Sequence, residues 1–374
     1  MNNTSLISSN LLQDKDTKIT QSEILAEFGK LDEIDNPLKI FERLRITDTT
    51  AIPPPVPVIT INGETISTEG NITTISGASK SGKSAFTGIL IAGAISKDGI
   101  IDGLDGVQVQ PNKKNKAILH FDTEQARHKH QYNLLSILRR CEIDHCPDYF
   151  LSYNIRALDL NEYADVTGNI CAAANEQFNG IHLIVIDGIA DYISDVNDPV
   201  QSNAIVKYFE ELAIKYSTPV IVIVHTNPGS DKERGHLGSQ CQRKSESVII
   251  VKTEVDISFI EPRFLKMAGK GNIPSIQFMY DKNKGYHVGC GIRSKEQAGK
   301  DAERIAGIKK VCSIVFSGQK AYGYKDAVDS IMKETNKALN TAKGMFADMK
   351  AHEMITQGAD KNWRINAGQN DSCD

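Results

Sequence analysis

The sequence predicts an α/β fold in which a mostly parallel sheet is flanked by helices. Short apolar segments alternate with helical segments along the middle of the chain, with expected strands at 72–76, 117–121, 182–187, 220–225 and 248–252. Their nearly continuous apolar character is typical of a parallel sheet covered on both faces. The first strand leads through a glycine-rich loop into an apolar helix, which is the context of a phosphate-binding motif.

Length and composition fit a globular protein with more than one domain. The chain has 374 residues, of which 40% are hydrophobic and 24% charged, and this excludes a wholly disordered chain or a fibre. No apolar run reaches the ~18–20 residues of a membrane span, and the start lacks the pattern of a signal peptide. The 7 cysteines are scattered and read as reduced thiols. We therefore expect a cytoplasmic protein with no membrane partner.

The segment before the sheet is expected to differ from it. Residues 1–20 are polar and predict a disordered N-terminus. Residues 21–54 predict a helical segment that ends in a proline-rich, stiff linker. Residues 58–67, centred on Asn62-Gly63, then predict a β-hairpin because both turn residues tolerate positive φ.

The last segment, 293–374, predicts a small C-terminal domain of winged-helix form. Helices are expected at 302–316, 325–334 and 341–352, followed by a short hairpin at 354–365. This segment has a net charge of +3, whereas the rest of the chain has −7. A mildly basic tail on an acidic body favours a separate interaction domain.

The loop after the first expected strand has the pattern G-x-x-x-x-G-K-[ST] between a strand and a helix. Its glycines let backbone N–H groups point at a phosphate near the positive end of the helix. Lys83 is expected to bridge the β- and γ-phosphate oxygens, and the Ser84 hydroxyl to bind Mg²⁺. The residues expected to hold ATP are Gly77, Ala78, Ser79, Lys80, Ser81, Gly82, Lys83, Ser84 and Ala85.

Two other expected strands end in acidic residues. The apolar strand 181–187 ends in Asp187, which is expected to join Ser84 as a ligand of Mg²⁺. The strand 117–121 runs into Asp122-Thr-Glu-Gln, which places Glu124 close after its carboxyl end. In a parallel sheet these acids are expected at the same edge as the phosphate loop.

The order of these motifs resembles the core of RecA-like ATPases. The phosphate loop, the strand ending Asp-Thr-Glu-Gln, the strand ending in Asp187, the strand ending in His225 and the Arg-Gly-His-Leu-Gly-Ser segment at 234–239 are most similar to the plasmid hexameric replicative helicase RepA and related ATPases of bacterial mobile elements. The resemblance covers residues 55–290 and implies a RecA-like P-loop domain at 55–292. It implies that Glu124 is the general base, with Asp122 as its neighbour, and that His225 senses the γ-phosphate.

The resemblance also implies contacts with nucleic acid and with a second subunit. The loop 226–236 corresponds to loops that line the channel of RecA-like rings, so Lys232 and Arg234 are expected to contact the phosphates of a single strand. The loop contains no aromatic residue for base stacking, which favours backbone contact. Lys266 and Lys270 are candidates for the basic residue that completes the neighbour's site. The family often has K-x-R there, and lysine lacks the rigid fork of arginine.

The expected winged helix supplies a second set of candidates for phosphate contact: Lys343, Lys350, Lys361 and Arg364. Contact with another protein is the alternative for this unit.

Together these features favour an ATP-hydrolysing motor that acts on nucleic acid. The resemblance implies a hexameric ring, a replicative helicase of a plasmid or mobile element, with single-stranded DNA as partner. One alternative is a non-unwinding, DNA-associated ATPase that loads or regulates a recombinase, primase or initiator. Another is a winged-helix DNA-binding regulator switched by ATP.

Overall fold

A computed structural model gives the fold of the chain. It describes residues 37–99, 104, 106–227, 231–254, 256–267, 269, 273–293, 295–352 and 354–366. The first helical turns in this part form η2 (Pro37–Leu44), within the segment 21–54 that is predicted to be helical. The expected disordered segment 1–20 lies outside the described residues.

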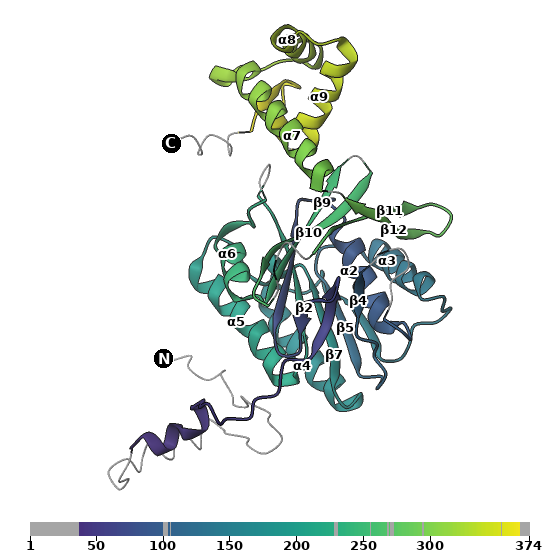
Figure 1. Ribbon diagram of the computed structural model, residues 1–374, viewed down its shortest axis with the longest axis vertical. Helices are drawn as coiled ribbons and strands as arrows, with labels where there is room; N and C mark the ends of the chain where they lie inside the picture. Colours follow the sequence, from purple (N-terminus) through teal and green to yellow (C-terminus); the bar gives the residue numbers. More distant parts are fainter. Residues whose placement is uncertain are drawn as a thin grey trace.

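The centre of the molecule is a nine-stranded sheet (Figure 1). Its strands are β3 (Ile72–Gly77), β5 (Ala117–Asp122), β6 (Phe150–Asn154), β7 (Ile181–Asp187), β8 (Val220–His225), β9 (Ser247–Glu254), β10 (Ile257–Leu265), β11 (Ser275–Asp281) and β12 (Tyr286–Arg293). Their order across the sheet is β12-β11-β10-β9-β3-β8-β7-β5-β6. The strands from β9 to β6 pair in parallel, whereas β9 to β12 pair antiparallel. The predicted mostly parallel sheet is confirmed, with the five expected strands as β3, β5, β7, β8 and β9.

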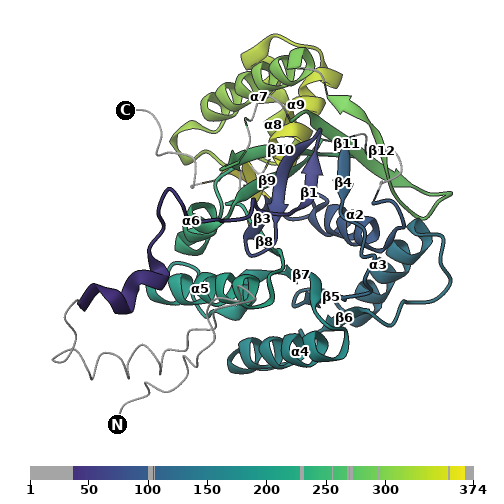
Figure 2. The ribbon, with the colours of Figure 1, turned by 60° about the horizontal axis from the view of Figure 1, so that its bottom comes forward.

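Helices cover both faces of this sheet, as predicted (Figure 2). The helices are α2 (Lys83–Ile95), α3 (Arg127–Arg140), α4 (Tyr163–Gln177), α5 (Pro199–Tyr216) and α6 (Gly235–Lys244), with short 3-10 turns η3 (Leu160–Glu162) and η4 (Ile189–Tyr192). Successive strand side chains point to opposite faces. Ile118 therefore packs in a core with α2 and α3, whereas Leu119 packs in a core with α4, α5 and α6.

A second, three-stranded sheet completes the core on the α2 side. It consists of β1 (Pro57–Ile61), β2 (Glu64–Thr68) and β4 (Val107–Val109), in the order β2-β1-β4. The predicted hairpin is confirmed, and its turn has φ of 52° at Asn62 and 78° at Gly63. Apolar residues of this sheet share the core of α2, so the hairpin is part of the same packed unit.

The C-terminal unit has a core of its own. It contains α7 (Lys295–Val315), η6 (Ser317–Gln319), α8 (Tyr324–Thr335), α9 (Leu339–Ala351), β13 (Ile355–Gln357) and β14 (Trp363–Ile365). Phe316, Ile331 and Phe346 lie in this core, and Trp363 packs against it. The three helices and the hairpin lie where the sequence predicts them, although α7 begins earlier than expected. The winged-helix assignment and the domain boundaries stay predictions.

None of the helices in the described part of the chain is both long enough and apolar enough to cross a membrane.

Candidate functional site

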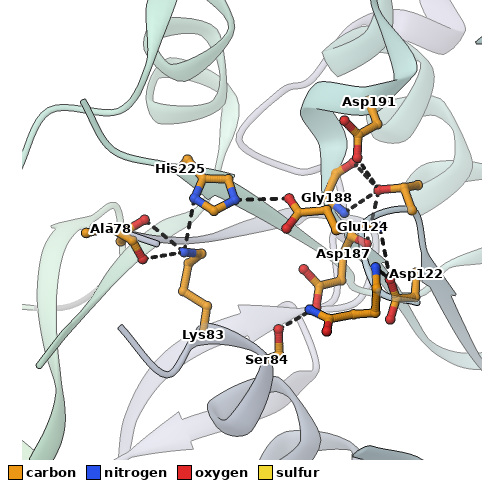
Figure 3. A network of polar contacts seen from close by, with 12 residues as sticks. Ala78, Lys83, Ser84, Asp122, Glu124, Asp187, Gly188, Asp191 and His225 are labelled. Atoms are coloured by element: carbon orange, nitrogen blue, oxygen red, sulfur yellow. Dashed lines mark hydrogen bonds and ion pairs between the residues drawn. The ribbon is translucent and has the colours of Figure 1, made fainter. Parts of the chain in front are cut away.

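The carboxyl ends of four parallel strands meet at one edge of the central sheet. Gly77 at the end of β3 is in register with His225 at the end of β8, and Asp122 of β5 is in register with Asp187 of β7. Strand β8 lies between β3 and β7, so His225 stands between the phosphate loop and the acidic strand ends. The structure thus brings together residues that the sequence predicts from separate motifs (Figure 3).

The phosphate loop, residues 77–84, requires glycine at both of its ends. A Cβ atom at Gly77 would lie 2.3 Å from the carbonyl oxygen of Val251. Gly82 has φ of 98°, and a Cβ atom there would lie 2.6 Å from Oγ of Ser258. Helix α2 begins immediately after Gly82, and the preceding residues Ala78, Ser79 and Lys80 are exposed. The loop therefore presents its backbone to solvent at the positive end of a helix, where an anion binds.

Lys83 is buried at the start of α2, and its ammonium group turns back to the loop. Nζ donates to the carbonyl oxygens of Gly77 at 2.9 Å and Ala78 at 2.7 Å. It lies 3.3 Å from Nδ1 of His225. Burial lowers the pKa of Lys83 to about 8, against the opposing effect of nearby carboxylates. Among the described residues, no carboxylate contacts this buried ammonium group directly, and a phosphate would supply that negative charge.

Ser84 and Asp187 form the predicted pair of metal ligands. Oγ of Ser84 donates to Oδ2 of Asp187 at 2.9 Å, across the gap between α2 and β7. Asp187 is buried, and this burial raises its pKa to about 6. A hydroxyl oxygen beside a buried carboxylate that is costly to ionise is a donor set that suits Mg²⁺, which prefers oxygen ligands.

Glu124 and His225 form a hydrogen-bonded pair beside this site. Nε2 of His225 lies 3.0 Å from Oε1 of Glu124, and the hydrogen bond lowers the pKa of the glutamate. Because the ammonium group of Lys83 can only donate, Nδ1 of His225 accepts and Nε2 carries the proton. One imidazole ring therefore joins the phosphate-loop lysine to the carboxylate predicted to act as base.

The turn that carries Glu124 is held by hydrogen bonds of the Asp122, Thr123 and Asp191 side chains. Oδ1 of Asp122 accepts the backbone N–H groups of Glu124 at 3.0 Å and Gln125 at 2.8 Å. Thr123 donates to Asp191 on η4 at 2.6 Å and accepts the Gly188 N–H group at 2.9 Å. Sequence reasoning missed Asp191, since four residues after Asp187 it has no strand-end pattern of its own.

A cavity of about 850 Å³ extends from this site along α2 and α3. The phosphate loop, Glu124, Asp187 and His225 line one end. At the other end it is lined by aromatic rings from α3, β11 and β12, namely Tyr132, Tyr280, Tyr286 and His287. Sequence reasoning missed this aromatic end because its residues come from segments about 150 positions apart. A second cavity, of about 490 Å³, adjoins Glu124 and is lined by Thr123, Arg156, Leu158, Leu160, Tyr163 and Asp191.

The predicted channel loop begins directly after His225. The backbone N–H group of Arg234 donates to the carbonyl oxygen of His225 at 2.9 Å, and α6 begins at the next residue. Asp231 pairs with Lys252 of β9 at 2.8 Å. The buried Glu233 pairs with Arg263 of β10 at 3.4 Å. The second half of the loop is thus fixed to the sheet. Lys232 lies between Asp231 and Glu233, in the part that follows residues 228–230, which the structure does not describe.

The two candidates for a contribution to a neighbouring subunit lie after β10. Lys266 is exposed, and its Nζ donates to the carbonyl oxygen of Lys244 at 3.1 Å. Leu265 pairs with Ser247 at the start of β9. Lys266 therefore lies at the amino ends of the parallel strands, opposite the end that carries the phosphate loop of its own chain. Lys270 lies outside the described residues. The structure therefore leaves Lys266 outside the site of its own chain.

The candidates in the C-terminal unit lie on α9 and the hairpin. Arg364 pairs with Asp360 through two hydrogen bonds of 2.9 and 2.6 Å. The ammonium group of Lys350 lies 5.7 Å from the ring centroid of Trp363. Lys343 is exposed on α9, and Lys361 is exposed in the hairpin turn. Their contact with nucleic acid stays a prediction.

A known protein family matches the part of the chain that carries this site. The family model AAA_25, described as an AAA domain, matches residues 38–231. Among solved structures, the chain is similar to a KaiC-like protein from the hyperthermophilic archaeon Pyrococcus horikoshii OT3, with 11% identity and a TM-score of 0.41 over 60% of this chain and 90% of that one. No curated protein matches the sequence. The family match spans more than half of the chain and contains every residue of the phosphate site described above. The protein therefore belongs to the AAA domain family, and it has the phosphate loop and the mostly parallel sheet of a P-loop ATPase.

Proposed function

We propose that the protein hydrolyses ATP and uses the reaction to change its grip on single-stranded nucleic acid. One observation carries the proposal. The side chain of His225 contacts both Lys83 and Glu124, while its carbonyl oxygen accepts the N–H group of Arg234 at the far end of the loop that follows. A γ-phosphate that draws Lys83 away from the imidazole acts on the residue from which the loop starts.

In the proposed reaction Glu124 takes a proton from the attacking water. Its lowered pKa keeps the carboxylate ionised at neutral pH, as a base requires. Lys83 leaves the loop carbonyl groups for the phosphate oxygens, and His225 keeps its Nε2 proton directed at Glu124. Bound Mg²⁺, held by Ser84 and Asp187, supplies neutralisation of the charge on the phosphates. Each chain thus provides a base, a phosphate ligand and a metal-binding pair.

The rest of the nucleotide is proposed to occupy the aromatic end of the large cavity. The volume of about 850 Å³ is within the usual range of sites for small ligands. The rings of Tyr132, Tyr280 and His287 offer flat surfaces on which a purine base can stack. The base would then contact α3 and the antiparallel extension of the sheet, while the phosphates contact the loop before α2.

The finer proposal is a ring of identical subunits that acts as a replicative helicase of a plasmid or mobile element. It is supported by the resemblance of motifs, by the position of the loop with Lys232 and Arg234 directly after His225, and by the exposure of Lys266 away from its own site. In such a ring Lys266 or Lys270 completes the neighbouring site, and the basic loop contacts strand phosphates without reading sequence.

The experiment compares ATP hydrolysis by the full chain with and without single-stranded DNA. Lys232→Ala/Arg234→Ala is expected to abolish stimulation by DNA and to leave the basal rate unchanged. Lys113→Ala/Lys114→Ala is the matched control and is expected to respond to DNA like the parent protein. It removes two exposed lysines that precede β5, at the opposite end of the strands from the loop. A strand-displacement assay with a forked duplex then separates an unwinding motor from a non-unwinding ATPase.

Two outcomes would overturn parts of the proposal. Full stimulation of the loop variant by single-stranded DNA would remove the channel role of the loop. Tight, sequence-specific duplex binding without DNA-stimulated turnover would instead favour the regulator, in which the C-terminal unit binds DNA and ATP controls assembly.

A further inference from the structure

A chain of hydrogen-bonded side chains lies behind the turn that carries Glu124. Oδ2 of Asp122 lies 2.9 Å from Nδ1 of His130 on α3. Nε2 of His130 lies 2.9 Å from Oγ of Ser152 on β6, and the same oxygen lies 2.9 Å from Nδ1 of His120 on β5. The rings of His120 and His130 are stacked, with centroids 5.3 Å apart. Asp122 and both histidines are at most 8% exposed.

The hydrogens of this chain have a consistent direction. The carboxylate of Asp122 accepts from Nδ1 of His130, so Nε2 of a neutral His130 accepts the Ser152 hydroxyl proton. Ser152 has a single proton, and its oxygen must then accept from Nδ1 of His120. Burial lowers the pKa of His120 to about 4, which keeps that ring neutral. Each polar atom in the chain from Asp122 to Nδ1 of His120 thus has a partner.

The order Asp–His–Ser is also that of a nucleophilic triad, but its surroundings do not support that use. Within the described part of the chain, neither cavity named above is lined by Ser152, His130 or His120. The hydroxyl group of Ser152 lies between two imidazole rings, and both of its hydrogen-bonding directions are occupied. A substrate has no route to this oxygen in the arrangement described.

The other end of the chain leads to the proposed base. The two oxygens of Asp122 divide their work: Oδ2 contacts His130, while Oδ1 accepts the N–H groups of Glu124 and Gln125. The Asp122 carboxylate cannot rotate without losing one set of contacts. A fixed carboxylate holds the backbone of Glu124, and this backbone determines where the Glu124 carboxylate lies.

We propose that His130, anchored by Ser152 and His120, is a positioning residue for ATP hydrolysis that acts on Glu124 through Asp122. The inference rests on the proposed function, since it assumes that Glu124 is the base. A misplaced base lowers the rate of the chemical step and leaves phosphate binding unaffected, because the phosphate loop and Lys83 make no contact with His130 in the described structure. Misplacement by about 1 Å can reduce a rate roughly 10²-fold.

The test uses two substitutions that each keep one of the two contacts of His130. In His130→Asn the side-chain amide reproduces the Nδ1–H donor to Asp122. In His130→Gln the longer amide reproduces the Nε2 position beside Ser152. We expect His130→Gln to lower kcat roughly 10- to 100-fold with KM for ATP changed less than about twofold. We expect the kcat of His130→Asn to stay within about threefold of the parent value. Thermal unfolding of both variants measures any loss of packing.

A double-mutant cycle with Glu124→Gln identifies the route of the effect. If His130 acts through Glu124, His130→Gln lowers the single-turnover rate of the parent protein but adds no loss in the Glu124→Gln background. If His130→Gln keeps the parental kcat while Glu124→Gln is inactive, the positioning role of His130 is overturned but the assignment of Glu124 as the base is not. Equal loss of kcat in His130→Asn and His130→Gln, in proportion to their loss of stability, would also overturn it. Parental hydrolysis by Glu124→Gln would instead overturn the proposed base.

Discussion

The imidazole of His225 donates from Nε2 to Oε1 of Glu124, over 3.0 Å. The two residues are 101 positions apart in the sequence, yet β7 alone separates their strands in the sheet. The same ring accepts from Lys83 through Nδ1. Any ligand that recruits Lys83 therefore changes the environment of Glu124, the proposed base, through a single side chain.

Replacement of the base tests the chemical assignment. Glu124→Gln is expected to bind ATP with parental affinity and to hydrolyse it roughly 10²-fold more slowly, since an amide takes no proton from water. Binding is measured by titration with ATP and turnover by phosphate release. The exposed Glu176→Gln on α4 is the control and should behave as the parent protein does. Parental turnover by Glu124→Gln would mean that another group removes the proton.

The loop glycines predict a difference between two alanine substitutions. Gly82→Ala places a Cβ atom 2.6 Å from Ser258 in a backbone with φ of 98°, whereas Gly63 has φ of 78° and no neighbouring atom within 4 Å. Both variants incur backbone strain of about 1–2 kcal/mol, but only Gly82→Ala also meets a steric clash. We expect Gly82→Ala to lower both the unfolding temperature and the affinity for ATP. Gly63→Ala is expected to lower the unfolding temperature alone. Equal ATP affinities of the two variants would contradict the requirement for glycine at position 82.

The buried histidine of β5 predicts how stability changes with pH. Burial lowers the pKa of His120 to about 4 in the folded state, from 6.5 in the unfolded chain. Between these values the unfolded chain binds more protons, so this contribution to stability is present above pH 6.5 and is lost as the pH falls towards 4. It amounts to roughly 3 kcal/mol.

The measurement is chemical denaturation between pH 4 and 7.5. His120→Asn keeps an amide donor towards Ser152 and should reduce the loss of stability on acidification. His145→Asn, at an exposed position, is the control. The interpretation of His120 fails if His120→Asn and the parent protein lose the same stability between these pH values.

The ion pair between the predicted channel loop and β10 predicts a large effect on stability. Glu233 is 1% exposed and pairs with Arg263 at 3.4 Å. Arg263→Met leaves a buried carboxylate without its partner and is expected to cost about 3–5 kcal/mol of unfolding free energy. Adding Glu233→Gln removes the buried charge and should recover part of this loss. If the double variant is less stable than Arg263→Met, the unpaired buried charge is not the cause of the lost stability.

Assembly is tested by dilution. If a neighbouring subunit completes the site, hydrolysis per chain should rise with protein concentration, in step with the mass measured in solution. Lys266→Ala should then lower kcat more than it changes affinity for ATP, and the exposed Lys207→Ala on α5 is the matched control. Constant specific activity with a monomeric mass over the whole range would exclude a site shared between subunits.

The sequence predicts the inner strands and the positions of the phosphate-site residues from two kinds of signal. Strands β7 and β8 are buried on both faces and are nearly all apolar, whereas β3 contains threonine and serine and is marked by the glycine-rich motif that follows it. The ends of the three strands are marked by Gly77, Asp187 and His225. Strand β6 lies at the sheet edge and contains Ser152 and Asn154, and β10 contains Pro262; neither has the continuous apolar pattern. The sequence does not predict the series of hydrogen-bonded side chains that joins Asp122 to His120, because α3, β6 and β5 meet only after folding.

The position of β9 has a consequence for synthesis of the protein. Strand β3 pairs on one side with β8 and on the other with β9, and β12 supplies the far wall of the large cavity. On the ribosome the glycine-rich loop leaves the exit tunnel long before Glu254 does. At about 5–20 residues per second, roughly 10–35 s pass between the two. During that interval one edge of β3 stays unpaired and open to aggregation. ATP in the cell cannot stabilise the nascent chain through the whole cavity until translation has passed β12.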